Sequence, residues 1–119
     1  MKYAIIAVKA LLTAAFLLAG GAKLIGAEMM VGTFEAVGVG QWFRYLTGLI
    51  EVGGAILLWV RGREAIAAGL LLVTMVGAVL AHLLILGPSA IPAIVLGLGA
   101  AFILWTHRDQ ISGRSTASA

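Results

Sequence analysis

Four long runs of apolar residues dominate the sequence and leave it few ways to fold in water. We place them at residues 3–22, 44–60, 65–86 and 91–106. Hydrophobic residues make up 62% of the chain and charged residues 11%, whereas soluble domains carry about 25% charged residues. A chain of 119 residues has too small a core to bury this much apolar surface. The composition therefore predicts an integral membrane protein.

The length of the runs predicts how they cross a bilayer. A helix rises about 1.5 Å per residue, so about 20 residues span roughly 30 Å of hydrocarbon. We expect an all-α fold, an integral membrane four-helix bundle, with residues 1–110 as one transmembrane domain. Residues 111–119 are mostly small and polar, so we expect a disordered cytoplasmic tail. Lys9 interrupts the first run, which favours a retained membrane helix over a cleaved secretory signal.

Basic residues are unequally shared between the two ends of the predicted helices. One end has Lys23 and Arg44, and the other has six basic residues: Lys2, Lys9, Arg61, Arg63, Arg108 and Arg114. Trp59 and Trp105 also mark the second end, as aromatic residues do at membrane interfaces. Because cytoplasmic segments carry the excess of lysine and arginine, we expect both termini to be cytoplasmic. The expected location is the inner membrane of a bacterium.

The connection between the first and second runs is longer than the other two. Within it, residues 27–37 place apolar side chains at helical spacing, and Gly38 and Gly40 follow as a stop signal. We therefore expect a short amphipathic helix between transmembrane helices 1 and 2. A plain interfacial linker is the alternative.

Glu51 is unusual because it lies well inside the second apolar run. An ionised carboxylate at the centre of a membrane helix costs about 2.5–3.5 kcal/mol, so we expect it to be paired, protonated or functional. Arg44 lies on the same helix face, two turns earlier, and Lys23 and His82 reach a similar depth from neighbouring helices. We expect Lys23 or His82, and not Arg44, to be the direct partner of Glu51.

Two interpretations of this cluster stay open. Glu51 either forms a buried ion pair that sets how three helices pack, or accepts protons or binds a ligand. His82 either makes an interhelical hydrogen bond or handles protons, for which imidazole is suited. Aromatic residues at the same depth would supply apolar walls for a flat ligand. The candidate ligand or proton site comprises Glu51, His82, Lys23, Arg44, Trp42 and Tyr45, and no catalytic residue is assigned.

Other classes of site find little support in the sequence. The chain has no cysteine, which removes disulfides, thiol redox relays and cysteine-based metal sites. One buried histidine and one carboxylate fall short of the three protein ligands of a catalytic zinc, so we expect no metal site. His107 is expected at the inner interface as a solvated side chain. The basic residues are scattered and form no phosphate-binding run, so nucleic acid is not an expected partner.

A resemblance to a known family rests on two segments and one histidine. The segments are FLLAGGAKL at residues 16–24 and WFRYLTGLIEVGGAILL at residues 42–58, and the histidine is His82, which ends the third helix. The chain resembles the DoxX-like family of small four-helix integral membrane proteins over most of its length. The positions that follow the family pattern are Gly20, Gly21, Lys23, Gly38 and Glu51. The resemblance implies a four-helix bundle, and it associates some members with quinone-linked redox systems and distant relatives with receptor or chaperone roles.

Three functions follow as hypotheses. The first is an accessory subunit of a quinone-linked redox system that holds a quinone headgroup near Glu51 and His82 in the outer third of the bundle. The alternative is a non-enzymatic membrane scaffold or assembly chaperone, whose partner besides the lipid bilayer is another membrane protein or a second copy of the chain. The third is a small proton-coupled exporter. Small multidrug transporters have a similar length, but they carry their carboxylate in the first helix, where this chain has none.

Overall fold

The computed structural model describes residues 1–87 and 89–112, and the described chain consists of helices and short turns. The helices in chain order are α1 (Lys2–Ile25), α2 (Glu28–Val37), α3 (Gln41–Leu57), α4 (Glu64–Ala81), the π-helix η1 (His82–Leu86), α5 (Ile91–Thr106) and α6 (Asp109–Ser112). The prediction of an all-α chain is confirmed. The predicted short helix over residues 27–37 is α2, and the four apolar runs overlap α1, α3, α4 with η1, and α5, although α3 begins three residues before the second run and ends three residues before its end.

The first long helix ends where its sequence changes from apolar residues to glycine. Gly26 has a φ of 74°, in the left-handed region that glycine adopts without steric cost. Its N–H donates to the Lys23 carbonyl, and the Ala27 N–H donates to the Ala22 carbonyl at 3.0 Å. This pair of hydrogen bonds is a Schellman motif, which satisfies carbonyls left open at a helix end. The turn redirects the chain into α2, which ends at Gly38, as predicted; Gly38 has a φ of 83°, and its N–H donates a single hydrogen bond to the Phe34 carbonyl at 3.2 Å.

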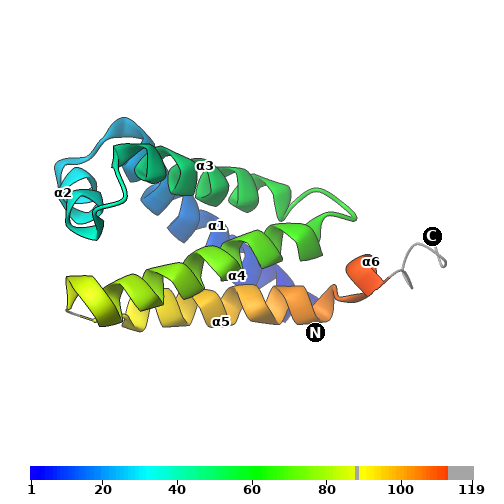
Figure 1. The fold of residues 1–119 in the computed structure, drawn as a ribbon. Helices are drawn as coiled ribbons and strands as arrows, with labels where there is room; N and C mark the ends of the chain where they lie inside the picture. Colours follow the sequence, from blue (N-terminus) through cyan, green and yellow to red (C-terminus); the bar gives the residue numbers. More distant parts are fainter. Residues whose placement is uncertain (88, 113–119) are drawn as a thin grey trace.

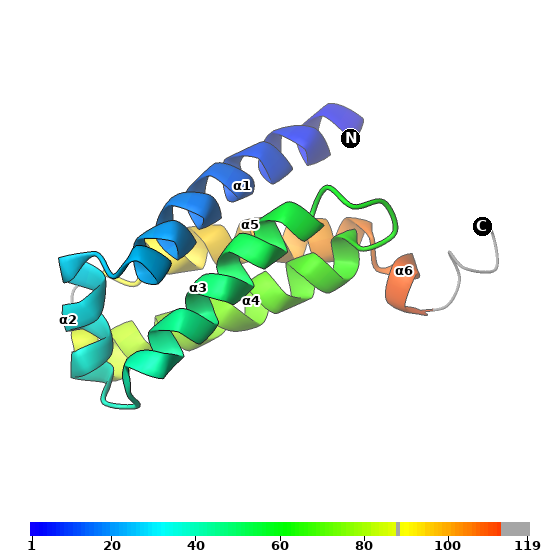
Figure 2. The same ribbon diagram turned by 90° about the horizontal axis from the view of Figure 1, so that it is seen from above.

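The long helices lie along one axis of an elongated molecule that measures 47 × 23 × 23 Å. Figure 1 shows α3, α4 and α5 side by side, with α2 lying across one end and α6 at the other. α1 runs obliquely behind them and packs mainly against α3 and also against α5 (Figures 1 and 2). Both the N-terminus and the turn between α3 and α4 lie at the α6 end. The molecule therefore has one end covered by α2 and an opposite end that carries α6 and the N-terminus.

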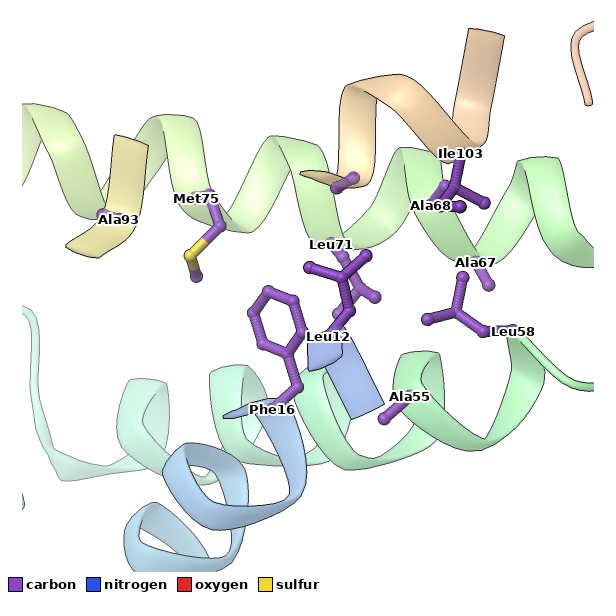
Figure 3. Packing of buried hydrophobic residues seen from close by; sticks show 11 residues of the cluster. Leu12, Phe16, Ala55, Leu58, Ala67, Ala68, Leu71, Met75, Ala93 and Ile103 are labelled. Carbon is purple, nitrogen blue, oxygen red and sulfur yellow. The ribbon is translucent and has the colours of Figure 1, made fainter. Parts of the chain in front are cut away.

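The core forms where apolar side chains from four helices meet between the helix axes. Phe16 of α1 and Leu71 of α4 are fully buried and point toward one another in Figure 3. Leu58, Ile103 and small alanines of α4 complete the contact between α3, α4 and α5. Fully burying a side chain of this size contributes about 1.5–3 kcal/mol in water, and the close fit adds dispersion contacts in any solvent.

The outside of the helices is also apolar. Leu18 of α1 is 75% exposed, and Leu98 of α5 is 66% exposed. α1 and the continuous segment Glu64–Leu86 are long and apolar enough to cross a membrane, and α5 is apolar but shorter. α3 has 17 residues and contains both Arg44 and Glu51. It therefore counts neither as a helix long enough to cross a membrane nor as a shorter apolar helix. Exposed apolar surface on this scale favours contact with lipid over contact with water.

The C-terminal segment is helical further along than we expected. Ile111 and Ser112 were placed in a disordered tail, but they belong to α6. Gln110 explains the order, because its side-chain oxygen accepts a hydrogen bond from the Ala65 N–H at 2.8 Å and thereby ties α6 to the start of α4. Residues 113–119, the rest of the expected tail, lie outside the described residues.

Candidate functional site

The site around Glu51 depends on a close approach between α1 and α3. A Cβ atom on Gly20 would lie 2.8 Å from Val52 Cγ2 and 3.0 Å from the Gly48 carbonyl oxygen. A Cβ atom on Gly48 would in turn lie 3.0 Å from Lys23 Cβ. A contact of 2.8 Å is closer than real Cβ atoms come, and contacts of 3.0 Å are tighter than most of them, so a larger residue at either position would push α1 and α3 apart. The two glycines therefore set the distance over which side chains of α1 and α3 meet.

Lys23 and Glu51 use this short distance to form a buried ion pair. Lys23 Nζ donates to Glu51 Oε1 at 2.8 Å, and the Glu51 and Lys23 side chains are only 2% and 12% exposed. This is the one hydrogen bond or ion pair that the described structure gives the Glu51 carboxylate. Removing both charges from solvent is costly, and this cost offsets much of the attraction between them. The packing of α1 against α3 therefore helps to hold the pair together. Of the two expected partners, the structure selects Lys23.

The Arg44 side chain lies at the C-terminal end of α1. Its Nη1 donates to the Lys23 carbonyl, its Nε donates to Gln41 Oε1 at 2.8 Å, and its guanidinium lies 4.3 Å from the centre of the Tyr45 ring. The side chain is buried and packs against Gly26, where a Cβ atom would lie 3.4 Å from Nη1. A helix C-terminus carries a partial negative charge, so two cations at this end are electrostatically favourable. As predicted, Arg44 makes no direct bond to Glu51 within the described residues.

Trp42 and Tyr45 lie on other faces of α3 than Glu51. Trp42 and Tyr45 are 60% and 48% exposed, and the indole N–H of Trp42 donates to the Val39 carbonyl at 3.2 Å. Successive residues are rotated by about 100° around a helix, so Trp42 lies half a turn around α3 from Glu51. Arg44, seven positions before Glu51, lies on almost the same face as Glu51. The same arithmetic on the sequence would have placed both aromatic residues away from Glu51.

His82 is the first residue of η1 and is half-buried. η1 packs against α2, the helix that covers this end of the molecule. The Glu51 carboxylate is occupied by Lys23, and among the contacts of the described residues none joins it to His82. The structure therefore brings together Lys23, Glu51 and Arg44, and it leaves the imidazole outside their network.

One residue of the network was missed in the sequence. Gln41 accepts the hydrogen bond of Arg44 and donates from Nε2 to the Val31 carbonyl of α2 at 3.1 Å. Gln41 lies one turn before Arg44 on α3, a spacing at which polar side chains meet, and this was the available signal. The hydrogen bonds form a continuous path from α2 through Gln41 and Arg44 to the end of α1.

A shallow, open hollow with a volume of about 490 Å³ lies beside Gln41 of this network. It lies between α2 and the start of α3, and none of the charged residues of the network lines it. Its walls are mostly apolar, with one carboxylate at the edge: Val31, Phe34, Glu35, Gly38, Gly40 and Gln41. Within residues 1–87 and 89–112, no group of three or more His, Cys, Asp or Glu side chains is placed to hold a metal ion.

A second polar cluster joins α4, α5 and α6 at the opposite end. Glu64 Oε1 accepts hydrogen bonds from the Gly62 N–H at 2.8 Å and from Gln110 Nε2 at 2.7 Å. His107 was expected to be solvated, but it is half-buried, with Nε2 at 4.0 Å from the Glu64 carboxylate and Nδ1 at 2.9 Å from the Ile103 carbonyl oxygen. These polar contacts to Glu64 and to the Ile103 carbonyl explain the difference. The cluster joins α4, α5 and α6.

The model of the DoxX-like family matches residues 7–105 of the chain. The chain belongs to the DoxX-like family. The family match and the apolar helices together identify this DoxX-like chain as a membrane protein. A search of curated proteins and a search of solved structures each found no match.

Proposed function

We propose that this DoxX-like chain crosses the membrane four times and works as a non-enzymatic scaffold that binds another membrane protein. Four crossings are supported by helix lengths: α1 has 24 residues and Glu64–Leu86 has 23, which correspond to roughly 35 Å. α3 and α5 are shorter, but they lie alongside the longer helices and reach from one end of the molecule to the other (Figure 1). The surplus of basic residues at the N-terminal end supports cytoplasmic termini, and a bacterial inner membrane remains the proposed location.

The observation that carries the scaffold proposal is the sealing of Glu51. The carboxylate is 2% exposed and hydrogen-bonded to Lys23, and the described hollow lies apart from it. A ligand that used Glu51 would have to displace Lys23 and separate α1 from α3, which are in contact through Gly20 and Gly48. The arrangement suits an ion pair that fixes helix packing and leaves the outer helix surfaces for a partner.

The quinone-linked hypothesis requires a different arrangement. A quinone headgroup needs hydrogen-bond donors for its carbonyls and apolar walls in one accessible pocket. Trp42 and Tyr45 face outward, and the Glu51 carboxylate is closed by Lys23. The exporter hypothesis likewise needs a carboxylate that exchanges protons with water, and Glu51 is shielded from water.

One experiment separates the three functions. The variant Lys23→Met/Glu51→Met removes both charges and keeps similar side-chain volumes. We expect the wild-type chain and this variant to co-purify with the same membrane-protein partner at the same stoichiometry, and a short-chain ubiquinone to show no saturable binding to either. Saturable quinone binding to the wild type that the variant loses would overturn the scaffold proposal. Proton-coupled efflux from vesicles that the variant abolishes would also overturn it.

A further inference from the structure

Exposed charge is sorted by sign along the long axis of the molecule. At the α2 end, Arg44 is 5% exposed and Lys23 is paired with Glu51, so neither cation is presented to a partner. The charged side chains that are exposed there are Glu28 and Glu35. The sequence places two basic residues at this end, but the fold buries both. Within the described residues, exposed positive charge is therefore confined to the opposite end.

The opposite end gathers basic side chains from three segments that are distant in sequence. We define the basic end as Lys2 and Lys9 of α1, Arg61 and Arg63 of the turn between α3 and α4, and Arg108 before α6. The side chains other than Lys9 are exposed, and Lys9 is half-exposed. Figures 1 and 2 both place the N-terminus, this turn and α6 at the same end of the molecule.

Basic side chains outnumber carboxylates at this end. The described part of the basic end contains two, Glu64 and Asp109. Glu64 is directed inward, where it accepts hydrogen bonds from Gln110 and from a backbone N–H and lies near His107. The arginines of the turn and Arg108 thus remain an exposed cationic surface.

Two tryptophans place this surface relative to the apolar belt. Lys9 Nζ lies 4.5 Å from the centre of the Trp59 ring, and Arg108 Cζ lies 4.3 Å from the centre of the Trp105 ring. The two indoles are 49% and 59% exposed at the end of the exposed apolar helix surface. Tryptophan prefers the depth at which hydrocarbon meets headgroups. Cations held over these rings therefore lie beside the level of lipid phosphates.

We propose that the basic end binds the headgroups of anionic phospholipids in the adjoining leaflet. Arginine presents a planar fork of donors that matches phosphate oxygens, and each cation near an anionic leaflet adds attraction that falls off within the Debye length. The apolar surface next to the cations would hold the acyl chains, which commits the site to a lipid and not to free phosphate. The acidic α2 end would repel the same headgroups. This inference does not depend on the scaffold function.

The tryptophans make the proposal measurable in the full-length protein. In a Trp42→Phe background, Trp59 and Trp105 report lipid contact at the basic end alone. The protein is reconstituted into vesicles that contain brominated phosphatidylglycerol or brominated phosphatidylcholine, and quenching of the tryptophan fluorescence gives the relative lipid affinity. We expect stronger quenching by the anionic lipid. Replacing Arg61, Arg63 and Arg108 with glutamine is expected to reduce the preference by about fivefold for each arginine.

Matched variants distinguish a headgroup site from general charge. Arg61→Lys/Arg63→Lys/Arg108→Lys keeps the charge but loses the planar fork, so it should retain only part of the preference, and Glu28→Gln/Glu35→Gln at the other end should leave it unchanged. Equal quenching by the two lipids, or a preference that survives the glutamine variant, would overturn the proposal. So would displacement by inorganic phosphate beyond the effect of sodium chloride at equal ionic strength.

A salt titration serves where the glutamine variant fails to reconstitute. At about 1 M salt the Debye length falls to about 3 Å, so the preference of the background protein for the anionic lipid should fall steeply. A preference that does not change with salt would count against the proposal in the same way.

Discussion

Removing Lys23 should destabilise the fold more than any other single charge change, because it leaves a carboxylate with 2% exposure and no remaining hydrogen-bond partner in the described structure. Losing one partner of a buried ion pair costs about 3–5 kcal/mol, whereas replacing both charges with apolar groups of similar volume is often close to neutral. We therefore expect Lys23→Met to lower the free energy of unfolding by about 3–5 kcal/mol.

The substitution Glu51→Met should lower the free energy of unfolding less than Lys23→Met does. In Glu51→Met, the Lys23 ammonium remains on a flexible stem at 12% exposure and can move toward solvent. The double variant Lys23→Met/Glu51→Met should approach wild-type stability, so the three free energies should be non-additive, with a coupling of at least about 2 kcal/mol.

Denaturant titration in detergent micelles, followed by circular dichroism, measures the three free energies. Lys9→Met is the matched control in the same helix, because Lys9 is half-exposed and interacts with the face of Trp59, a contact worth about 1 kcal/mol. Additive effects of the two single changes, or a Lys23→Met cost no larger than that of the control, would refute the sealed ion pair.

Three further changes test how the helices are held together. Gly20→Ala should cost about 1–3 kcal/mol, because its methyl group would overlap a side chain and a carbonyl of α3, while Gly21→Ala, which meets nothing within 4 Å, should be neutral or stabilising. Arg44→Lys should cost about 1–3 kcal/mol by losing the guanidinium contacts to α1 and Gln41, and a cost equal to that of the exposed Arg63→Lys would contradict this role. Gln110→Ala should cost about 1 kcal/mol and increase hydrogen exchange at the start of α4, since the side chain caps an open N–H there; unchanged exchange would argue against the cap.

The positions of the helices could be predicted because they depend on local properties. An apolar run of sufficient length forms a helix wherever it packs, and glycines such as Gly26 and Gly38 end helices through backbone conformations that glycine adopts without steric cost. The extension of α6 past residue 110 was not predictable in this way. Four residues form no stable helix alone, and α6 depends on a hydrogen bond between residues 65 and 110, far apart in sequence.

The candidate site was predicted in part. Depth along a helix follows from residue number, so the sequence located Glu51 and narrowed its direct partners to Lys23 and His82. Trp42 and Tyr45 share the end of the helix on which Glu51 lies, but they are rotated away from it around the helix axis. Rotation alone would have excluded the two aromatic residues from the Glu51 face.

The sequence by itself determined a helical membrane protein of the DoxX-like family, an intramembrane glutamate that needs a partner, and an excess of basic residues at one end. The helices, the glutamate and the basic excess follow from composition, periodicity and chain order, and the family follows from the match of its model to residues 7–105. Only the tertiary structure decided that Lys23 neutralises Glu51, that Arg44 is buried against the end of α1, and that exposed positive charge is confined to one end. The physical reason is the separation of α1 and α3, which Gly20 and Gly48 reduce until one lysine reaches one carboxylate. Distances between helices are set by contacts that no local pattern encodes.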